Sequence, residues 1–211
     1  MAIEVERLSV GIILTNCYLV RCSADGETVV IDPGAEGEKI LAVAEKKKLR
    51  LRYIINTHGH GDHIGANRYM KEQTGAEILI HAADAPLLLS ARDNLSTWIP
   101  GGITSPPADR LLTDGDTIVC GETVFRVLST PGHTPGSISL VTPGLAFTGD
   151  ALFKESIGRT DFPGGSLIDL LTGIRENLFT LPEDTVVYPG HGPATTIGHE
   201  QLYNTFFNRD N

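Results

Sequence analysis

The segment from residue 58 to residue 63 concentrates side chains that bind metal ions. It reads His-Gly-His-Gly-Asp-His, and it contains three of the 7 histidines of the chain. In an extended segment, His58 and His60 project to the same side and can bind one ion. Asp62 and His63 lie where the chain is expected to turn into a helix, so they face a neighbouring position. The segment therefore predicts a loop that serves two adjacent ions.

Three more ligand candidates follow predicted strands later in the chain. They are His133 in STPGHTPGS, Asp150 in AFTGDALF and His191 in VYPGHGP, and each comes directly after a glycine. Turns with Gly and Pro hold a side chain at the end of a strand. Convergence of these turns on one cleft would supply the remaining ligands that a metal needs. Asp62 also has a structural alternative, as the N-cap of the helix that follows it.

Composition and charge limit the class of protein. The 211 residues are 41% hydrophobic and 20% charged, which is typical of a globular protein. We expect one domain over residues 1–211. The net charge of -9 argues against a nucleic-acid partner. No apolar run is long enough to cross a bilayer, and the first residues lack a signal peptide, so we expect no membrane partner. The cysteines, odd in number, are expected as reduced thiols in a cytoplasmic protein.

Alternating apolar patterns predict strands and helices along the whole chain. Strands are expected at 12–20, 28–32, 53–56, 76–81, 116–130, 137–142, 145–149 and 185–189. Helices are expected at 36–49 and 64–74, from Ser166 with a Ser-x-x-Asp cap, and from 197. Residues 89–108, rich in Pro and Gly, are expected to be irregular. The order favours an α/β fold, an αββα sandwich of two mixed sheets flanked by helices, over a plain doubly wound sheet.

The full ligand pattern resembles that of the metallo-β-lactamase superfamily over residues 32–191. The resemblance implies two divalent ions, with zinc expected and iron or manganese as alternatives. It assigns His58, His60 and His133 to the first ion, and Asp62, His63 and His191 to the second. Asp150 would bridge both, together with a water or hydroxide. Asp62 and Asp150 are the catalytic carboxylates in this interpretation.

Other polar residues have two interpretations or match no position of the family. The aspartate that matches Asp32 supports the ligand loop in the family, which implies a supporting role here. Its alternative is a turn residue at the end of a strand. His81 and His199 match no family position, and we treat both as non-ligands.

A pair of ions that holds a hydroxide predicts hydrolysis at a carbonyl or phosphoryl centre. A β-lactamase of the superfamily is expected to carry cysteine in place of Asp150, which disfavours that activity. The motifs contain no spare acid to protonate a poor leaving group. A thiolate leaves without one, because the pKa of a thiol is about 8.5. Thioester hydrolysis therefore suits these residues best.

Residues 149–166, GDALFKESIGRTDFPGGS, resemble the short bacterial form of the glyoxalase II group, which hydrolyses S-lactoylglutathione to lactate and glutathione. The resemblance implies a small-molecule thioester as the partner, with a glutathione conjugate expected, and a monomer or small homo-oligomer. Arg159, with Lys154, would meet a substrate carboxylate; the alternative is that Arg159 pairs with Asp161. We expect no helical C-terminal domain of the kind that helps the longer enzymes bind glutathione, which leaves glutathione specificity open.

Three alternatives remain from the sequence. A persulfide dioxygenase of the same fold carries a similar motif and uses one iron, held by residues that match His58, His133 and Asp150. A phosphodiesterase would use the same pair of ions. A binding module without metal is the third alternative, although every ligand position holds a competent residue.

Overall fold

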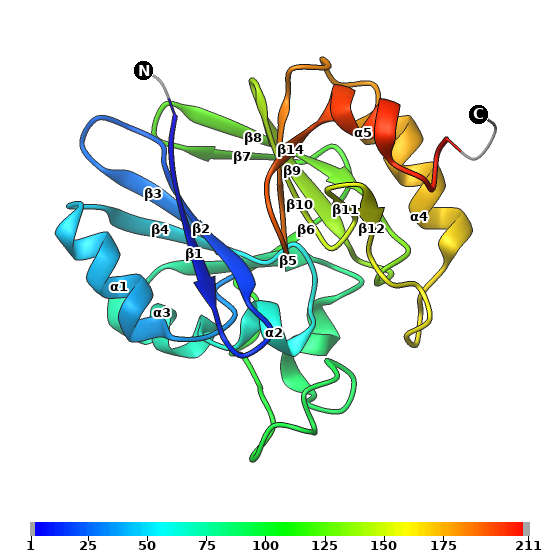
Figure 1. Cartoon of the computed structure of the whole chain (residues 1–211). Coiled ribbons are helices and arrows are strands. Elements are labelled where there is room, and N and C mark those ends of the chain that lie inside the picture. The colour runs from blue at the N-terminus through cyan, green and yellow to red at the C-terminus, as the bar shows by residue number, and fades with distance from the viewer. Residues whose placement is uncertain (1–2, 209–211) are drawn as a thin grey trace.

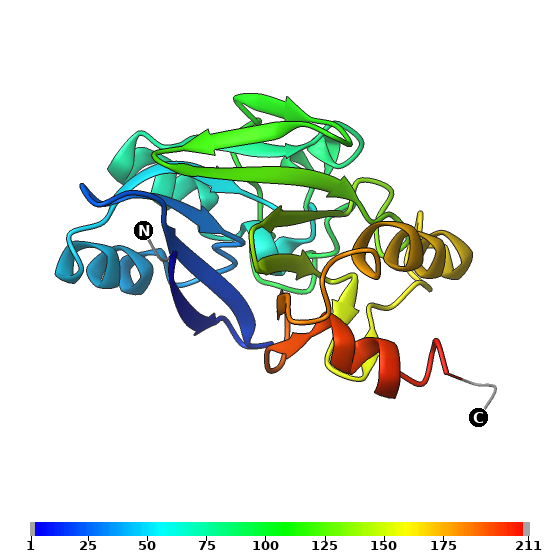
Figure 2. The same ribbon diagram turned by 90° about the horizontal axis from the view of Figure 1, so that it is seen from above.

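Two sheets stack face to face in the computed structural model, which describes residues 3–208, and helices cover their outer sides (Figures 1 and 2). The first sheet has 6 strands, of which β1–β3 run antiparallel and β3–β6 run parallel. In spatial order they are β1 Glu4–Val10, β2 Thr15–Arg21, β3 Glu27–Ile31, β4 Arg50–Ile55, β5 Glu77–His81 and β6 Arg110–Leu112.

The second sheet also has 6 strands, and only the β10–β13 pair is parallel among its described residues. Its spatial order is β14 Thr195–Thr196, β13 Val186–Pro189, β10 Leu145–Gly149, β9 Ile138–Thr142, β8 Thr123–Ser129 and β7 Thr117–Cys120. A separate hairpin pairs β11 Leu152–Phe153 with β12 Ser156–Ile157. Both sheets are therefore mixed.

Short helices complete the layers. They are α1 Gly37–Lys46, α2 Gly61–Ile64, α3 Asn67–Thr74, α4 Leu167–Gly173 and α5 Ile197–Tyr203, with a 3-10 turn Ala85–Leu89 and a π turn Ile174–Leu178. α1 and α3 lie on the outer side of the first sheet, and α4 and α5 lie beside the second (Figures 1 and 2).

The apolar strands are buried on both faces, which explains why they read as nearly continuous apolar runs. In β2, Tyr18 and Val20 face the second sheet, whereas Leu19 between them packs on the helix side with Ile40 of α1. Outside the second sheet, a third cluster joins Leu128 and Val187 to Leu170, Ile174 and Ile197. Three apolar clusters thus separate four layers, and the expected αββα sandwich is confirmed.

The structure departs from the sequence predictions at the N-terminal end of the first sheet. β1 was not expected, and residues 12–14, placed in a strand by the prediction, instead form the turn between β1 and β2. Gly11 and Leu14 adopt left-handed backbone conformations there, with φ of 71° and 59°. The apolar side chains of this turn obscured it, because turns are normally polar.

The helix predicted over residues 64–74 is divided in two. α2 ends at Ile64, and Ala66 donates its backbone N–H to the carbonyl oxygen of Pro33 at 2.8 Å instead of continuing the helix. The predicted stop at Gly75 is confirmed by its left-handed conformation. The Ser166 cap is also confirmed, since its Oγ accepts the backbone N–H of Asp169 at 3.3 Å.

The helix length, the irregular segment and the cysteines of the chain can also be compared with the sequence predictions. α1 is shorter than the predicted 36–49 helix. Of the segment 89–108, which was expected to be irregular, residues 90–108 contain no strand or helix, whereas Leu89 ends the 3-10 turn. Cys17, Cys22 and Cys120 are buried free thiols. Among the described residues, no helix combines the length and the apolar character needed to cross a bilayer.

We expect the interior between the sheets to depend strongly on Phe147, which is fully buried and stacks on Tyr188 with ring centroids 5.2 Å apart. Phe147→Ala should lower the free energy of unfolding by about 3–5 kcal/mol, because the cavity cannot fully collapse. Urea denaturation of the metal-loaded protein measures this. Ile168→Ala on α4, where the side chain is 77% exposed, serves as the control and should change stability by about 0.5 kcal/mol or less. Equal losses for the two variants would contradict the packing described.

Candidate metal centre

The ligand candidates meet at one end of the sandwich because strands of both sheets end there. Asp32 follows β3, and the segment 58–63 follows its parallel neighbour β4. In the second sheet, Asp150 and His191 follow the parallel strands β10 and β13. His133 comes from the connection between β8 and β9. All seven predicted ligands therefore fall into groups whose ligand atoms lie within 4.8 Å of one another.

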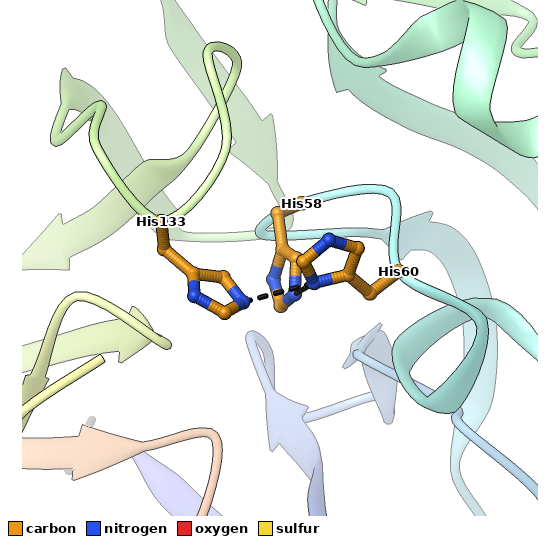
Figure 3. Close-up of side chains that lie close together, drawn as sticks. All are labelled: His58, His60 and His133. Atoms are coloured by element: carbon orange, nitrogen blue, oxygen red, sulfur yellow. Dashed lines mark hydrogen bonds between the residues drawn. The ribbon is translucent and has the colours of Figure 1, made fainter. Parts of the chain in front are cut away.

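Three ring nitrogens converge in the first group (Figure 3). His60 Nδ1 lies 3.1 Å from His58 Nε2 and 2.9 Å from His133 Nε2. Three imidazoles around one zinc ion, with Zn–N bonds of about 2.0–2.1 Å, place their nitrogens roughly 3.3 Å apart in a tetrahedral arrangement. The observed spacing is close to that of a metal site.

The second group consists of Asp62, His63 and His191. Asp62 Oδ2 lies 3.2 Å from His63 Nε2 and 3.2 Å from His191 Nε2. The same oxygen accepts a hydrogen bond from the hydroxyl of Thr15 at 3.1 Å. Asp62 lies inside α2, whose N-cap is His60, so its alternative role as a helix cap does not match the structure.

Asp150 lies between the two groups. Its Oδ1 is 3.4 Å from His63 Nε2, and its Oδ2 is 3.6 Å from both His133 Nε2 and His191 Nε2. Gly190 packs directly against it, since a Cβ at that position would lie 2.2 Å from Asp150 Oδ1. The carboxylate therefore has the position that a bridging ligand requires.

Burial and neighbouring charges shift the pKa values of these ligand candidates in different directions. Burial, aided by the neighbouring histidines, lowers the pKa of His58, and burial beside His133 lowers the pKa of His60 to about 4. Burial alone would raise the pKa of Asp62 and Asp150, but the charge of His63 holds both below the usual range. Although burial disfavours its charge, the pKa of His63 is raised by Asp62, Asp150 and Asp32.

Unsatisfied buried atoms test whether a metal would fit. His63 Nε2 and Asp150 Oδ1 are buried and have no hydrogen-bond partner among the described residues. Buried polar atoms normally have a partner, and a cation would satisfy both. Neutral imidazoles in one group and ionised carboxylates in the other form a suitable donor set. The residues fit a pair of divalent ions.

Asp32 supports the ligand loop through hydrogen bonds to Thr57. Its Oδ1 accepts the backbone N–H of Thr57 at 2.8 Å, and its Oδ2 accepts the Thr57 hydroxyl at 2.7 Å. The same Oδ2 lies 3.0 Å from His63 Nδ1. Asp32 also has a left-handed φ of 51°, as a turn residue does, so the two interpretations coincide in one residue.

His133 is oriented by the segment that follows β12. Its Nδ1 donates to the carbonyl oxygen of Arg159 at 2.7 Å, which leaves Nε2 free to accept. Metal-binding histidines are commonly fixed in this way. His199 instead contacts Glu155 at 2.9 Å, and neither it nor His81 belongs to a ligand group.

Asp84, which the sequence analysis missed, joins two ligand loops. This buried carboxylate accepts the backbone N–H of Gly59 at 2.8 Å, between His58 and His60. It also accepts the Thr134 hydroxyl and the backbone N–H of Gly136, both at 2.7 Å, beside His133. Burial raises its pKa despite these bonds. Its only sequence signal was an acidic residue shortly after a predicted strand.

A cavity of about 390 Å³ opens onto the ligand atoms. Arg159 lines it, but its guanidinium pairs with Asp161 at 2.9 and 2.7 Å and stacks over Phe162 at 4.2 Å. This pair corresponds to the alternative interpretation of Arg159, in which it pairs with Asp161 and does not contact a substrate carboxylate. Lys154 is exposed and does not line the cavity. Residues of the irregular segment, including Trp98 and Ile99, form part of the wall.

We expect Asp84→Ala to lower metal affinity by about tenfold to 100-fold, because two ligand loops lose their shared acceptor. Competition with a chromophoric chelator measures the affinity. Asp93→Asn, at an exposed position in the irregular segment, is the control and should leave the affinity unchanged. Wild-type affinity in Asp84→Ala would show that the loops do not depend on this residue.

Known proteins resemble this chain along nearly its whole length. Residues 10–191 match the metallo-beta-lactamase superfamily. The probable metallo-hydrolase YqgX of Bacillus subtilis is 40% identical, over 96% of this chain and 97% of that protein. The hydroxyacylglutathione hydrolase GloC of Haemophilus influenzae is 34% identical, over 97% of this chain and 98% of that protein.

Solved structures agree with this relationship. BLEG-1, described as a B3 metallo-beta-lactamase, aligns with a TM-score of 0.93 and 37% identity, covering 97% of this chain and 100% of that one. TTHA1623 in a di-iron-bound form aligns with a TM-score of 0.85 and 37% identity, covering 95% and 99%. ETHE1 from Myxococcus xanthus aligns with a TM-score of 0.81 and 33% identity, covering 95% and 83%. The chain therefore belongs to the metallo-β-lactamase superfamily.

Proposed function

We propose that this protein is a metal-dependent hydrolase of thioesters, with S-lactoylglutathione as its first candidate substrate. The observation that carries the proposal is the position of Asp150 between two complete ligand groups. His58, His60 and His133 would hold one ion, Asp62, His63 and His191 the other, and Asp150 would contact both. When bound, such a pair supplies a hydroxide at neutral pH and polarises a carbonyl oxygen.

The residues around the cavity suit a good leaving group. Apart from the ligand candidates, the polar side chains that line it are Asn94, Ser96, Ser156 and Arg159, and none of them is a ready proton donor at neutral pH. An alkoxide or amide leaving group needs such a donor, but a thiolate does not. The similarity to the GloC hydrolase supports the same substrate class.

Arg159 is the one Lys or Arg among the described residues that line the cavity. Its pair with Asp161 is exposed, and exposed ion pairs contribute only about 0–1 kcal/mol. The guanidinium can therefore exchange Asp161 for a substrate carboxylate at little cost. In this role Arg159 positions the thiol half of the substrate.

Two competing activities have specific support. The similarity to BLEG-1 favours hydrolysis of a β-lactam. The similarity to ETHE1, together with the shared motif, favours a persulfide dioxygenase with a single iron on His58, His133 and Asp150. Because the dioxygenase carries a similar motif, the ligand residues do not separate the two activities, whereas metal content per chain and oxygen uptake do.

The test of the proposal is release of free thiol from S-lactoylglutathione, with nitrocefin hydrolysis and oxygen uptake with glutathione persulfide measured in parallel. We expect thiol release that falls at least 100-fold after chelation and returns with zinc, iron or manganese, at about two ions per chain by elemental analysis. His191→Ala should reduce this content to about one ion, whereas the control His199→Ala should retain both. One iron per chain with oxygen uptake and no thiol release would instead establish the dioxygenase.

We expect Arg159→Ala to raise KM for S-lactoylglutathione about tenfold with little change in kcat, because a charge-assisted contact to a carboxylate is lost. S-lactoyl-N-acetylcysteamine has no carboxylate, so its KM should not change. Lys154→Ala is the matched control, and both values should stay at wild type. An equal rise in KM for the two thioesters would contradict a carboxylate contact.

A further inference from the structure

Large apolar side chains are exposed beside the metal centre. The turn between β1 and β2 presents Ile12, Ile13 and Leu14, which are 79%, 47% and 63% exposed. Across from it in the cavity wall, the irregular segment presents Trp98, which is 57% exposed. Clusters of this kind on a protein surface usually mark a binding site, because exposure of apolar side chains to water is unfavourable.

These side chains form a groove that leads away from the ligand atoms. A cavity of about 400 Å³ is lined by Val10, Ile12, Ile13, Trp98, Ile99 and Ile103, together with residues that follow β3 and α2. Ile13, Asp62, Trp98 and Ile99 line both this groove and the cavity over the ligand atoms. The groove therefore adjoins the cavity over the ligand atoms.

The two adjoining cavities differ in the chemistry of their lining residues. Arg159 and Ser156 lie in the wall of the cavity over the ligand atoms and are absent from the groove. The described lining of the groove contains no Lys or Arg, and its charged residues, Glu36 and Asp62, are both acidic. An anionic group such as a glutathione carboxylate would be repelled there. An uncharged, apolar group fits the groove.

We propose that this groove binds the acyl chain of the thioester substrate, so that the enzyme hydrolyses thioesters with longer apolar acyl groups faster than acetyl thioesters. The inference rests on the proposed thioester hydrolysis. The thioester carbonyl lies at the ligand atoms, the polar thiol half extends towards Arg159, and the acyl chain lies between Ile13 and Trp98. Specificity then comes mainly from the acyl half.

The first experiment is kinetic and uses the metal-loaded protein with S-acetyl-, S-butyryl- and S-hexanoylglutathione, which share one thiol half. Each fully buried methylene should raise kcat/KM about fourfold, and hexanoyl has four more methylenes than acetyl, so partial burial of this chain should still raise kcat/KM at least tenfold. Ile13→Ser should lower this ratio about fivefold. Leu14→Ser is the matched control, because Leu14 lies in the same turn and lines neither cavity, so its ratio should stay at wild type.

The second experiment measures binding without turnover. Trp98 is the only tryptophan of the chain, so its emission reports on the groove. S-hexylglutathione, a thioether that cannot be hydrolysed, should shift the emission of the zinc-loaded protein to shorter wavelength and protect it from acrylamide. It should bind at least tenfold more tightly than S-methylglutathione. Ile13→Ser should weaken this preference, and Leu14→Ser should not.

The outcomes separate this proposal from the proposed function. If no thioester is hydrolysed but the preference for S-hexylglutathione persists, the thioesterase proposal fails and the apolar binding groove stands. If thioesters are hydrolysed with a flat dependence on chain length, and the two thioethers bind equally, the groove proposal is overturned. It is also overturned if Ile13→Ser changes sedimentation but not selectivity, since the groove would then contact a second copy of the chain.

Discussion

The close approach of buried ligand atoms, some of them without a hydrogen-bond partner, shapes the functional end of this molecule. Ring nitrogens and carboxylate oxygens from both sheets face one another at 2.9–3.6 Å. Among them, His63 Nε2 and Asp150 Oδ1 are buried without a hydrogen-bond partner in the described part of the chain. In a protein interior such an arrangement is unfavourable unless cations occupy it. The sandwich forces the groups together, because apolar clusters on both faces of each sheet fix the ends of β4, β10 and β13. Core packing thereby stabilises a site that is poised for metal.

Two buried aspartates connect the packed core to the loops that carry the ligand candidates. Asp32 connects the end of β3 to the Thr57–His63 segment, and Asp84 connects that segment to the loop of His133. Each accepts hydrogen bonds from backbone N–H groups, so each fixes the course of the chain rather than a single side chain. Loops held in this way can present imidazoles in one orientation, which a metal site needs and which short loops alone do not provide.

Much of this arrangement could be predicted from the sequence, since the ligands sit in short motifs and the strands are apolar on both faces. The αββα order followed from where the apolar runs lie. The turn at residues 11–14 could not be recognised, because it carries two isoleucines that line the groove and an exposed leucine instead of polar turn residues. The break between α2 and α3 depends on a hydrogen bond from Ala66 to Pro33, which only the folded chain brings together. Asp84 was missed for the same reason, as its partners are distant in sequence.

The parallel pairing of β10 with β13 has a consequence for how the protein matures. Asp150 and His191 follow these neighbouring strands, and β13 is inserted in the sheet between β10 and β14. Until that insertion occurs, neither the bridging position nor the second ligand group is complete. A nascent or partly unfolded chain thus offers the cell's metal pool only fragments of a site. A full pair of ions would then be held only by a chain whose last long strand has docked.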